Sequence, residues 1–354
     1  MTWLVLAMGL VLLIIGADLL VRGAARLAAS FGVPALVIGL TVVAFGTSAP
    51  ELAVSVKSAW SGQAELAIAN VVGSNIFNVL FILGVAALVS PLIVSGQLIR
   101  QDVPIMVALS LVAVFMAHNG SIGKLEAGLL VLGLILYTAF LFVQGRKQGV
   151  DHGGDEVGEL TEASRPLWHN LMLVVVGLLL LVIGARWLVN SAVEIASALG
   201  VSEAVVGLTI VAAGTSLPEV MTSIIATLKG ERDIAIGNVV GSNIFNILCV
   251  LGLSGLLSPL PLAAGPHLAQ IDLPIMLGVA MLCLPLFFTG AVVNRLEGFL
   301  FLTLYIAYTW YLVALAVAAE NLAALQAGIL YGLVPLIVVY VMGSLGRDLY
   351  RRKR

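Results

Sequence analysis

The sequence contains one long pattern twice. TVVAFGTSAPELAVS, which begins at Thr41, matches TIVAAGTSLPEVMTS, which begins at Thr209, and IANVVGSNIFNVLFILG matches IGNVVGSNIFNILCVLG further along each copy. Both matches have the same offset of 168 residues, and residues 41–92 are identical to residues 209–260 at 28 of 52 positions without a gap. A repeat of this length predicts a fold that is built from two copies of one structural unit.

Apolar segments of membrane-spanning length fill most of both copies. The 354 residues are 61% hydrophobic and only 10% charged, whereas soluble domains carry about 25% charged residues. A helix needs about 20 apolar residues to cross the hydrocarbon core of a bilayer. We therefore predict eleven spans, at about 2–21, 33–60, 66–90, 101–118, 125–143, 169–190, 201–228, 233–258, 268–289, 297–318 and 325–345.

Each copy contains five of these spans, an odd number, so the second copy must enter the membrane with the opposite polarity. Inverted repeats of this kind are an architecture of secondary transporters, with the binding site near the midplane between the copies. We predict an all-α membrane protein with ten core transmembrane helices, arranged as two inverted five-helix repeats, plus one extra C-terminal helix. The expected segments are a first repeat at 1–143, an acidic linker at 144–168, a second repeat at 169–319, and an appended helix with a basic tail at 320–354.

Positive charges in the loops predict the orientation in a cell membrane. If the N-terminus is outside, 14 of the 17 Lys and Arg residues lie in inside segments, and only Lys57, Lys124 and Arg186 lie outside. Cytoplasmic loops carry the excess of Lys and Arg in membrane proteins. We expect a multi-pass protein of the cytoplasmic membrane, with its N-terminus outside and with the C-terminus and the 144–168 linker in the cytoplasm.

The repeated motif places helix-breaking residues and a carboxylate inside a span. Gly46 and Pro50 interrupt the helical hydrogen-bond ladder, because proline has no N–H group and clashes with the preceding turn. Such breaks survive in a membrane only where they line protein or a wet cavity. An ionisable group such as Glu51 costs roughly 2.5–3.5 kcal/mol at the bilayer centre. Na⁺ or Ca²⁺ requires a shell of hard oxygens, which are offered by Thr47, Ser48 and Glu51 in the first copy and by Thr215, Ser216 and Glu219 in the second.

A second motif, GSNIFN, follows in the next span of each copy. Ser74 and Asn78 are four residues apart and share one helix face, as do Ser242 and Asn246. The asparagine between them, Asn75 in the first copy, points about 100° away, which favours a role in packing or in satisfying backbone groups. Glycines at 73 and 241 are expected to let two spans approach closely.

Three aspartates outside these motifs have simpler interpretations. Asp102 and Asp272 each lie two residues before a proline, which predicts that they cap helix N-termini. Asp18 lies four residues before Arg22, which predicts a local ion pair.

GTSAPE…NVVGSNIFN and GTSLPE…NVVGSNIFN resemble the two α-repeats of the Ca²⁺/cation antiporter superfamily, in particular the prokaryotic sodium/calcium exchangers. The resemblance covers everything but the linker and the tail, and it implies ion binding between the second, third, seventh and eighth helices. Some family members carry aspartate at the position of Asn246, so the asparagine here leaves proton coupling and stoichiometry open. The implied ligands are the side chains of Thr47, Ser48, Glu51, Ser74, Asn78, Thr215, Ser216, Glu219, Ser242 and Asn246 and the main-chain carbonyls of Ala44 and Ala212.

These observations predict an antiporter that exchanges Ca²⁺ for Na⁺ by alternating access, and not an enzyme. Glu51 and Glu219 give the site a charge near −2, which one Ca²⁺ or two Na⁺ would neutralise. The resemblance suggests that the first and sixth helices, which match as GADLLVRGA and GARWLVNSA, slide past the others. We expect Ca²⁺ and Na⁺ as ligands, no cofactor, the lipid bilayer but no nucleic acid as a partner, and function as a monomer.

Two other functions remain open. A cation/proton antiporter, for Ca²⁺/H⁺ or Na⁺/H⁺ exchange, would use the same two glutamates as proton carriers. A cation channel lined by the same residues is less favoured, because inverted repeats with midplane carboxylates indicate one buried site and not a continuous pore.

Overall fold

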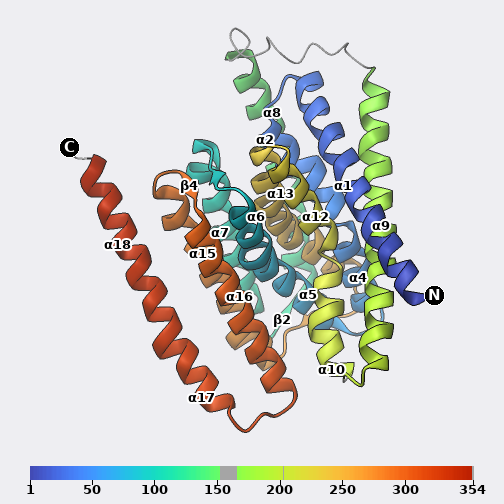
Figure 1. Cartoon of the computed structure of the whole chain (residues 1–354), viewed down its shortest axis with the longest axis vertical. Helices are drawn as coiled ribbons and strands as arrows, with labels where there is room; N and C mark the ends of the chain where they lie inside the picture. Colours follow the sequence, from blue (N-terminus) through green and yellow to red (C-terminus); the bar gives the residue numbers. More distant parts are fainter. Residues whose placement is uncertain (152–165, 202, 353–354) are drawn as a thin grey trace.

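The computed structural model describes residues 1–151, 166–201 and 203–352 (Figure 1). In this part of the chain, nine helices are long and apolar enough to cross a membrane. A tenth span is formed by the pair Ala35–Thr47 and Ala49–Trp60, which is bent by 46°. This confirms the predicted all-α membrane fold. Most of the predicted 144–168 linker lies outside the described residues.

The first repeat contains five spans. They are α1 (Thr2–Phe31); α2 (Ala35–Ile38), η1 (Gly39–Val43), α3 (Ala44–Thr47) and α4 (Ala49–Trp60); α5 (Ala64–Phe77), η2 (Asn78–Leu83) and α6 (Gly84–Val89); η3 (Leu98–Asp102) and α7 (Val103–Ala117); and α8 (Lys124–Asp151). The η segments are single turns or short runs of π-helix, in which the backbone carries one extra residue per turn. Such π-bulges are frequent at functional sites.

The second repeat follows the same plan. Its elements are α9 (Leu167–Ala198); α10 (Glu203–Val206), η4 (Gly207–Val211), α11 (Ala212–Gly214) and α12 (Leu217–Leu228); α13 (Arg232–Phe245), η5 (Asn246–Leu251) and α14 (Gly252–Leu257); η6 (Leu268–Asp272) and α15 (Leu273–Phe288); and α16 (Arg295–Ala316). The appended span consists of α17 (Leu322–Ala327), η7 (Gly328–Leu333) and α18 (Val334–Arg352). It lies at the edge of the molecule, beside α15 and α16 (Figure 1).

The predicted span at 201–228 differs from the others because its described part is not one long helix. It is divided at Thr215 and Ser216, and its second half, α12, has 12 residues. The first copy is divided at the equivalent place, Ser48. Each break lies two residues before the proline of the motif, so the sequence repeat and the structural break coincide.

Two small sheets demonstrate the inversion of the repeats. β1 (Leu92–Ile93) pairs antiparallel with β4 (Val292–Val293), and β2 (Ser121–Ile122) pairs antiparallel with β3 (Leu262–Ala263). Each sheet joins non-equivalent loops of the two copies, since β1 and β3 both follow the third span of their own repeat. The span Leu98–Ala117 connects β1 to β2 and has 20 residues, or about 30 Å of helix. Equivalent loops therefore lie at opposite ends of the molecule.

Helices α1 and α9, the first spans of the two repeats, lie side by side at one edge of the molecule (Figure 1). A Cβ atom at Gly16 would lie 2.8 Å from the carbonyl oxygen of Gly177, so only glycine permits this approach. Small residues at such contacts let membrane helices pack closely. Asp18 forms the predicted ion pair with Arg22 (2.9 Å) and a second one with Lys229, which follows α12.

The prediction that Asp102 and Asp272 cap helices is wrong. Neither side chain accepts a hydrogen bond from the helix that follows, because η3 and η6 already continue the helical backbone through both residues. Each aspartate instead holds the fifth span of its repeat. Asp102 Oδ1 accepts from the Tyr137 hydroxyl at 3.2 Å, and Asp272 Oδ1 accepts from the Tyr308 hydroxyl at 3.0 Å.

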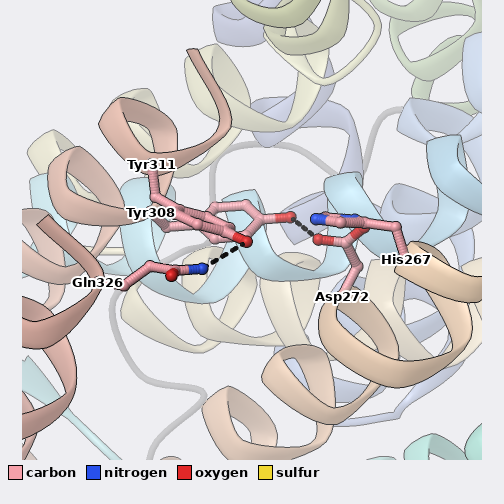
Figure 2. Close-up of polar contacts among 5 residues, drawn as sticks. All are labelled: His267, Asp272, Tyr308, Tyr311 and Gln326. Atoms are coloured by element: carbon pink, nitrogen blue, oxygen red, sulfur yellow. Dashed lines mark hydrogen bonds and ion pairs between the residues drawn. The ribbon is translucent and has the colours of Figure 1, made fainter. Parts of the chain in front are cut away.

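Figure 2 shows the second of these clusters at the start of α15. His267 Nδ1 lies 3.0 Å from Asp272 Oδ2, on the side of the carboxylate away from Tyr308. The His267 ring stacks on Tyr311, whose hydroxyl accepts a 3.3 Å hydrogen bond from Gln326 on α17. The appended span is thus attached to the core through a polar side chain as well as through apolar packing.

Candidate ion-binding site

Two broken helices form the framework of the candidate site. The break lies at Ser48 (φ −78°, ψ 5°) in the first repeat and at Ser216 (φ −89°, ψ 8°) in the second. Pro50 and Pro218 then occupy the first turns of α4 and α12. Proline is tolerated there because the first N–H groups of a helix have no intrahelical partner. Each break therefore creates a helix C-terminus and a helix N-terminus inside the protein.

Glu51 and Glu219 lie in these first turns and are 0% and 1% exposed. Each carboxylate is bound by a serine of the other repeat: Ser216 Oγ donates to Glu51 Oε1 at 2.7 Å, and Ser48 Oγ donates to Glu219 Oε1 at 3.1 Å. The positive end of the helix dipole stabilises a carboxylate at this position. The two predicted acids are thus brought into one crossed arrangement between the repeats.

Further predicted residues join this arrangement from the third and eighth spans. Ser216 Oγ lies 3.2 Å from Ser74 Oγ on α5. Asn78 and Asn246 begin η2 and η5, and both are fully buried. Ser242 lies one turn before Asn246 and is also buried. The second, third, seventh and eighth spans are the ones that the resemblance implied. All four contribute polar side chains to this region.

Six side-chain oxygens of the predicted ligands are buried and have no hydrogen-bond partner in the part of the chain that the structure describes. A buried acceptor without a partner costs about 1–3 kcal/mol, and oxygens in this condition are ready ligands for a hard cation. They are Glu51 Oε2, Glu219 Oε2, Asn78 Oδ1, Asn246 Oδ1, Thr215 Oγ1 and Ser242 Oγ.

The remaining predicted ligands have a different status. Thr47 Oγ1 lies within hydrogen-bond distance of Asn238 Oδ1 (3.0 Å) and of the Ala44 carbonyl (3.3 Å). The Ala44 carbonyl accepts the Ser48 N–H at 3.0 Å. The single hydroxyl hydrogen of Thr47 can serve either Asn238 Oδ1 or this carbonyl. Ala212 is the first residue of α11 and takes the equivalent place in the second repeat.

Asn70 and Asn238 support the glutamates and were missed by sequence reasoning. Asn70 Nδ2 donates to the Glu51 carbonyl (3.2 Å) and to Ser55 Oγ (2.9 Å). Asn238 makes the equivalent bonds, to the Glu219 carbonyl at 3.3 Å and to a serine hydroxyl at 3.0 Å. Asn70 and Asn238 match in the repeat alignment, and this identity of a polar residue inside an apolar span is the signal that could have found them.

The two copies of the broken helix are packed differently. A Cβ atom at Gly241 would lie 2.8 Å from the Leu40 backbone, which confirms the close approach expected there. Among the residues whose side chains the structure describes, a Cβ atom at Gly73 would meet no neighbour within 4 Å, so the close approach expected for the first copy stays a prediction. Correspondingly, Val43 is 0% exposed and its counterpart Val211 is 46% exposed. The segments α2, η1 and α3 all pack against α13, whereas in the second copy the contact with α5 is made by α11.

The chemistry available is the binding of hard cations. Among the described residues no three His, Cys, Asp or Glu side chains form a group that could hold a metal ion. In the same part of the chain, the acids at the site are Glu51 and Glu219, and the other oxygens are neutral hydroxyl, amide and carbonyl groups.

Comparisons with known proteins agree with this geometry. The family described as sodium/calcium exchanger protein matches residues 1–143 and 169–314. The sodium/calcium exchanger MaX1 of Methanosarcina acetivorans is 34% identical over 344 residues, covering 86% of this chain and 97% of MaX1. The inner membrane protein YrbG of Escherichia coli is 39% identical over 264 residues, covering 72% and 79%.

A solved structure of the sodium-calcium exchanger NCX_Mj, soaked with zero Na⁺ and Ca²⁺, superposes with a TM-score of 0.75 at 30% sequence identity. It covers 89% of this chain and 98% of that one. The chain therefore belongs to the sodium/calcium exchanger family within the Ca²⁺/cation antiporters, whose members are membrane transporters and not enzymes.

Proposed function

We propose that this chain exchanges Ca²⁺ for Na⁺ across the cytoplasmic membrane, at the site between the two broken helices. One observation carries the proposal. Glu51 and Glu219 each use one carboxylate oxygen to accept a serine of the opposite repeat and leave the other buried without a partner. With Asn78, Asn246, Thr215 and Ser242 this makes six available oxygens, and Ca²⁺ takes 6–8 oxygen ligands.

The charge of the site makes Ca²⁺ and Na⁺ compete for it. The two carboxylates supply −2, so a single Ca²⁺ neutralises the site. Two Na⁺ ions do the same, and they draw on the same oxygens. Because charges in a poorly solvated site interact far more strongly than in water, loads that leave the site charged are disfavoured. Occupancy by one ion type therefore displaces the other, which is the requirement for exchange.

The unequal packing of the two half-helices supports alternating access. With the predicted orientation, α10–η4–α11 lies on the outer side and α2–η1–α3 on the cytoplasmic side. The site would then be open to the outside and closed to the cytoplasm. We propose that α1 and α9, joined through Gly16 and Gly177, move as one unit against the other helices to reverse this arrangement.

All the proposed ligands come from one chain, so we propose that the monomer is the functional unit. Ca²⁺ and Na⁺ are its cargo, and no cofactor takes part. The predicted spans and the similarity to an inner membrane protein support the proposed location in the cytoplasmic membrane.

Transport by the purified protein in liposomes tests the proposal. Vesicles loaded with Na⁺, K⁺ or choline at equal ionic strength are diluted into buffer with labelled Ca²⁺, each with and without an imposed pH gradient. We expect uptake only from Na⁺-loaded vesicles, independent of the pH gradient. Uptake that needs the pH gradient and not Na⁺ would support the cation/proton antiporter instead. Equal flux without any counter-ion gradient would indicate a channel, and vesicles without protein provide the background.

A further inference from the structure

Four asparagines form a closed network between the repeats, next to the candidate site. Asn78 Nδ2 donates to Asn243 Oδ1 at 3.0 Å, and Asn246 Nδ2 donates to Asn75 Oδ1 at 3.0 Å. All four residues are at most 2% exposed. Each bond joins an asparagine that is a proposed ligand to one from the other repeat that is not.

The direction of an amide decides whether it attracts or repels a cation. Its carbonyl oxygen is an acceptor and a ligand for hard ions, whereas its NH₂ group carries two hydrogens and only donates. Oxygen and nitrogen have nearly the same shape, so packing alone does not select between the two orientations. Hydrogen-bond partners must make this selection for Asn78 and Asn246.

The orientation of the Asn75 and Asn243 amides is fixed by their own hydrogen-bond partners. The partners of their NH₂ groups can only accept hydrogen bonds. Asn243 Nδ2 donates to the Asn75 carbonyl oxygen (3.3 Å) and to Met106 Sδ (3.6 Å). Asn75 Nδ2 donates to the Asn243 carbonyl oxygen (3.3 Å) and to Met276 Sδ (3.7 Å). Carbonyl oxygens and thioether sulfurs have no hydrogen to give. Each NH₂ group must therefore face them, and each Oδ1 must face the ligand asparagine.

We infer that Asn75 and Asn243 are positioning residues that orient the Asn246 and Asn78 amides so that their oxygens, and not their NH₂ groups, face the cation. The inference rests on the proposed function, since it concerns the same site. Each ligand asparagine must turn its NH₂ group towards the fixed Oδ1, which leaves its own oxygen free. Asn78 Oδ1 and Asn246 Oδ1 are indeed buried and without a partner among the described residues. Met106 on the fourth span and Met276 on the ninth span supply the sulfur acceptors for Asn243 and Asn75.

A double-mutant cycle on cation binding tests the inference, because only residues that act through one another give non-additive effects. The variants are Asn78→Ala, Asn243→Ala and the double variant, with affinity for Ca²⁺ and for Na⁺ measured on the same purified samples. We expect Asn243→Ala to weaken binding about tenfold, which corresponds to about 1.4 kcal/mol. The double variant should bind no more weakly than Asn78→Ala.

The crossed pair is the matched control. Asn243 and Asn246 lie on the same segment but are not hydrogen-bonded through their side chains, so Asn243→Ala and Asn246→Ala should multiply their effects. A general packing defect would act equally on both cycles. Binding by Asn243→Ala within twofold of the unaltered protein, or multiplied effects in the Asn78 cycle, would overturn the inference.

A substitute variant and a separate Na⁺ measurement keep the outcome of the test unambiguous. If Asn243→Ala does not fold, Met106→Leu replaces it, because this swap keeps the side-chain volume but removes the accept-only sulfur. It should weaken cation binding severalfold with an unchanged melting temperature, and unchanged binding would contradict the inference. An unaltered protein that binds Na⁺ but not Ca²⁺ would refute Ca²⁺ exchange, while the Na⁺ cycle would still decide the role of Asn243.

Discussion

Glu51 and Glu219 combine full burial with a carboxylate oxygen that has no hydrogen-bond partner among the described residues. Replacing either with glutamine keeps the volume but removes one of the two charges that would face Ca²⁺. We expect Glu51→Gln and Glu219→Gln each to weaken Ca²⁺ binding by several kcal/mol, which is a hundredfold or more, and to abolish Na⁺-driven Ca²⁺ flux in liposomes. Both variants should insert and fold, because a buried charge in a membrane costs roughly 2.5–3.5 kcal/mol.

Glu126→Gln is the matched control for these variants. The Glu126 carboxylate lies at the start of α8, where its Oε2 accepts the Gly123 N–H at 2.7 Å, far along the chain from either broken helix. The Glu126→Gln variant should transport Ca²⁺ nearly as the unaltered protein does when equal amounts of protein are incorporated into the liposomes. Flux by Glu51→Gln or Glu219→Gln within threefold of the unaltered protein would contradict a site built on these two acids.

Asn246 offers a second prediction at the same scale. Its NH₂ group donates to Asn75 Oδ1, so an ionised aspartate at 246 would set a carboxylate against that oxygen. Protonation of the aspartate relieves the contact, and protons then compete with Ca²⁺. We expect Asn246→Asp to fold and to lose Ca²⁺ affinity more steeply than the unaltered protein as the pH is lowered from about 8 to about 5. Binding isotherms across this range measure it, and parallel pH profiles would place residue 246 outside the ion shell.

At the residue scale, the acids and hydroxyls of the candidate site were predictable for two reasons. The motif occurs twice in the sequence, and its buried carboxylate is energetically costly in a membrane. The support of the Glu51 carbonyl by Asn70 was not predictable, because 19 positions separate the two residues and only the packing of α4 on α5 brings them together. The 100° offset of Asn75 predicted a role in packing or in satisfying backbone groups, and its Nδ2 does donate to the Asn243 carbonyl oxygen. Its partners, Asn246 and Met276, lie in the other repeat and could not be read from helical spacing.

At the scale of elements, the fourth and fifth spans of each repeat are joined by one aspartate. Asp102 Oδ2 accepts from Gln97 Nε2 at 3.1 Å, and in the other copy Asp272 Oδ2 lies 3.0 Å from His267 Nδ1 (Figure 2). Gln97 and His267 thus occupy equivalent positions, and each is the partner of Oδ2 of its aspartate. We expect His267→Gln to keep the melting temperature of the purified protein and His267→Leu to lower it. The leucine leaves Asp272 Oδ2 without its partner, at a cost of about 1–3 kcal/mol, while Oδ1 still accepts from Tyr308.

The two His267 variants separate the hydrogen bond from the aromatic contact. The imidazole also stacks on Tyr311 with ring centroids 6.3 Å apart, a contact that both variants remove. Equal destabilisation of His267→Gln and His267→Leu would therefore show that stacking, and not donation to Asp272, secures α15 to α16. Thermal unfolding followed by intrinsic fluorescence in detergent measures the difference.

Element boundaries show where sequence patterns stop being informative. Long apolar runs predicted the spans, and the proline after each break predicted the divided helices. The two-residue strands, such as β1, are too short to leave a periodic signal, and they pair only because inverted repeats bring their loops together. The π-helical turns η3 and η6 also have no pattern of their own, and they are the reason that Asp102 and Asp272 do not cap helices.

At the scale of the whole molecule, the odd number of spans per repeat predicted the inversion, and the sheet pairing agrees with it. β1 pairs with β4 and β2 with β3, so equivalent loops lie at opposite ends. Neither observation says which end faces the cytoplasm. Only the distribution of Lys and Arg predicts that, since the two ends are built from the same motifs.

Cysteine labelling in intact cells decides the orientation, and the chain offers two suitable positions at either end of the fourth span. Gly96 lies between β1 and η3, where an added Cβ would meet nothing within 4 Å, and His118 is exposed after α7. The native thiols, Cys249 and Cys283, are both buried and should not react. We expect His118→Cys to react with a membrane-impermeant maleimide and Gly96→Cys to react only after the cells are permeabilised. The reverse pattern would place the N-terminus inside, and α10–η4–α11, the half-helix with the exposed Val211, would then face the cytoplasm.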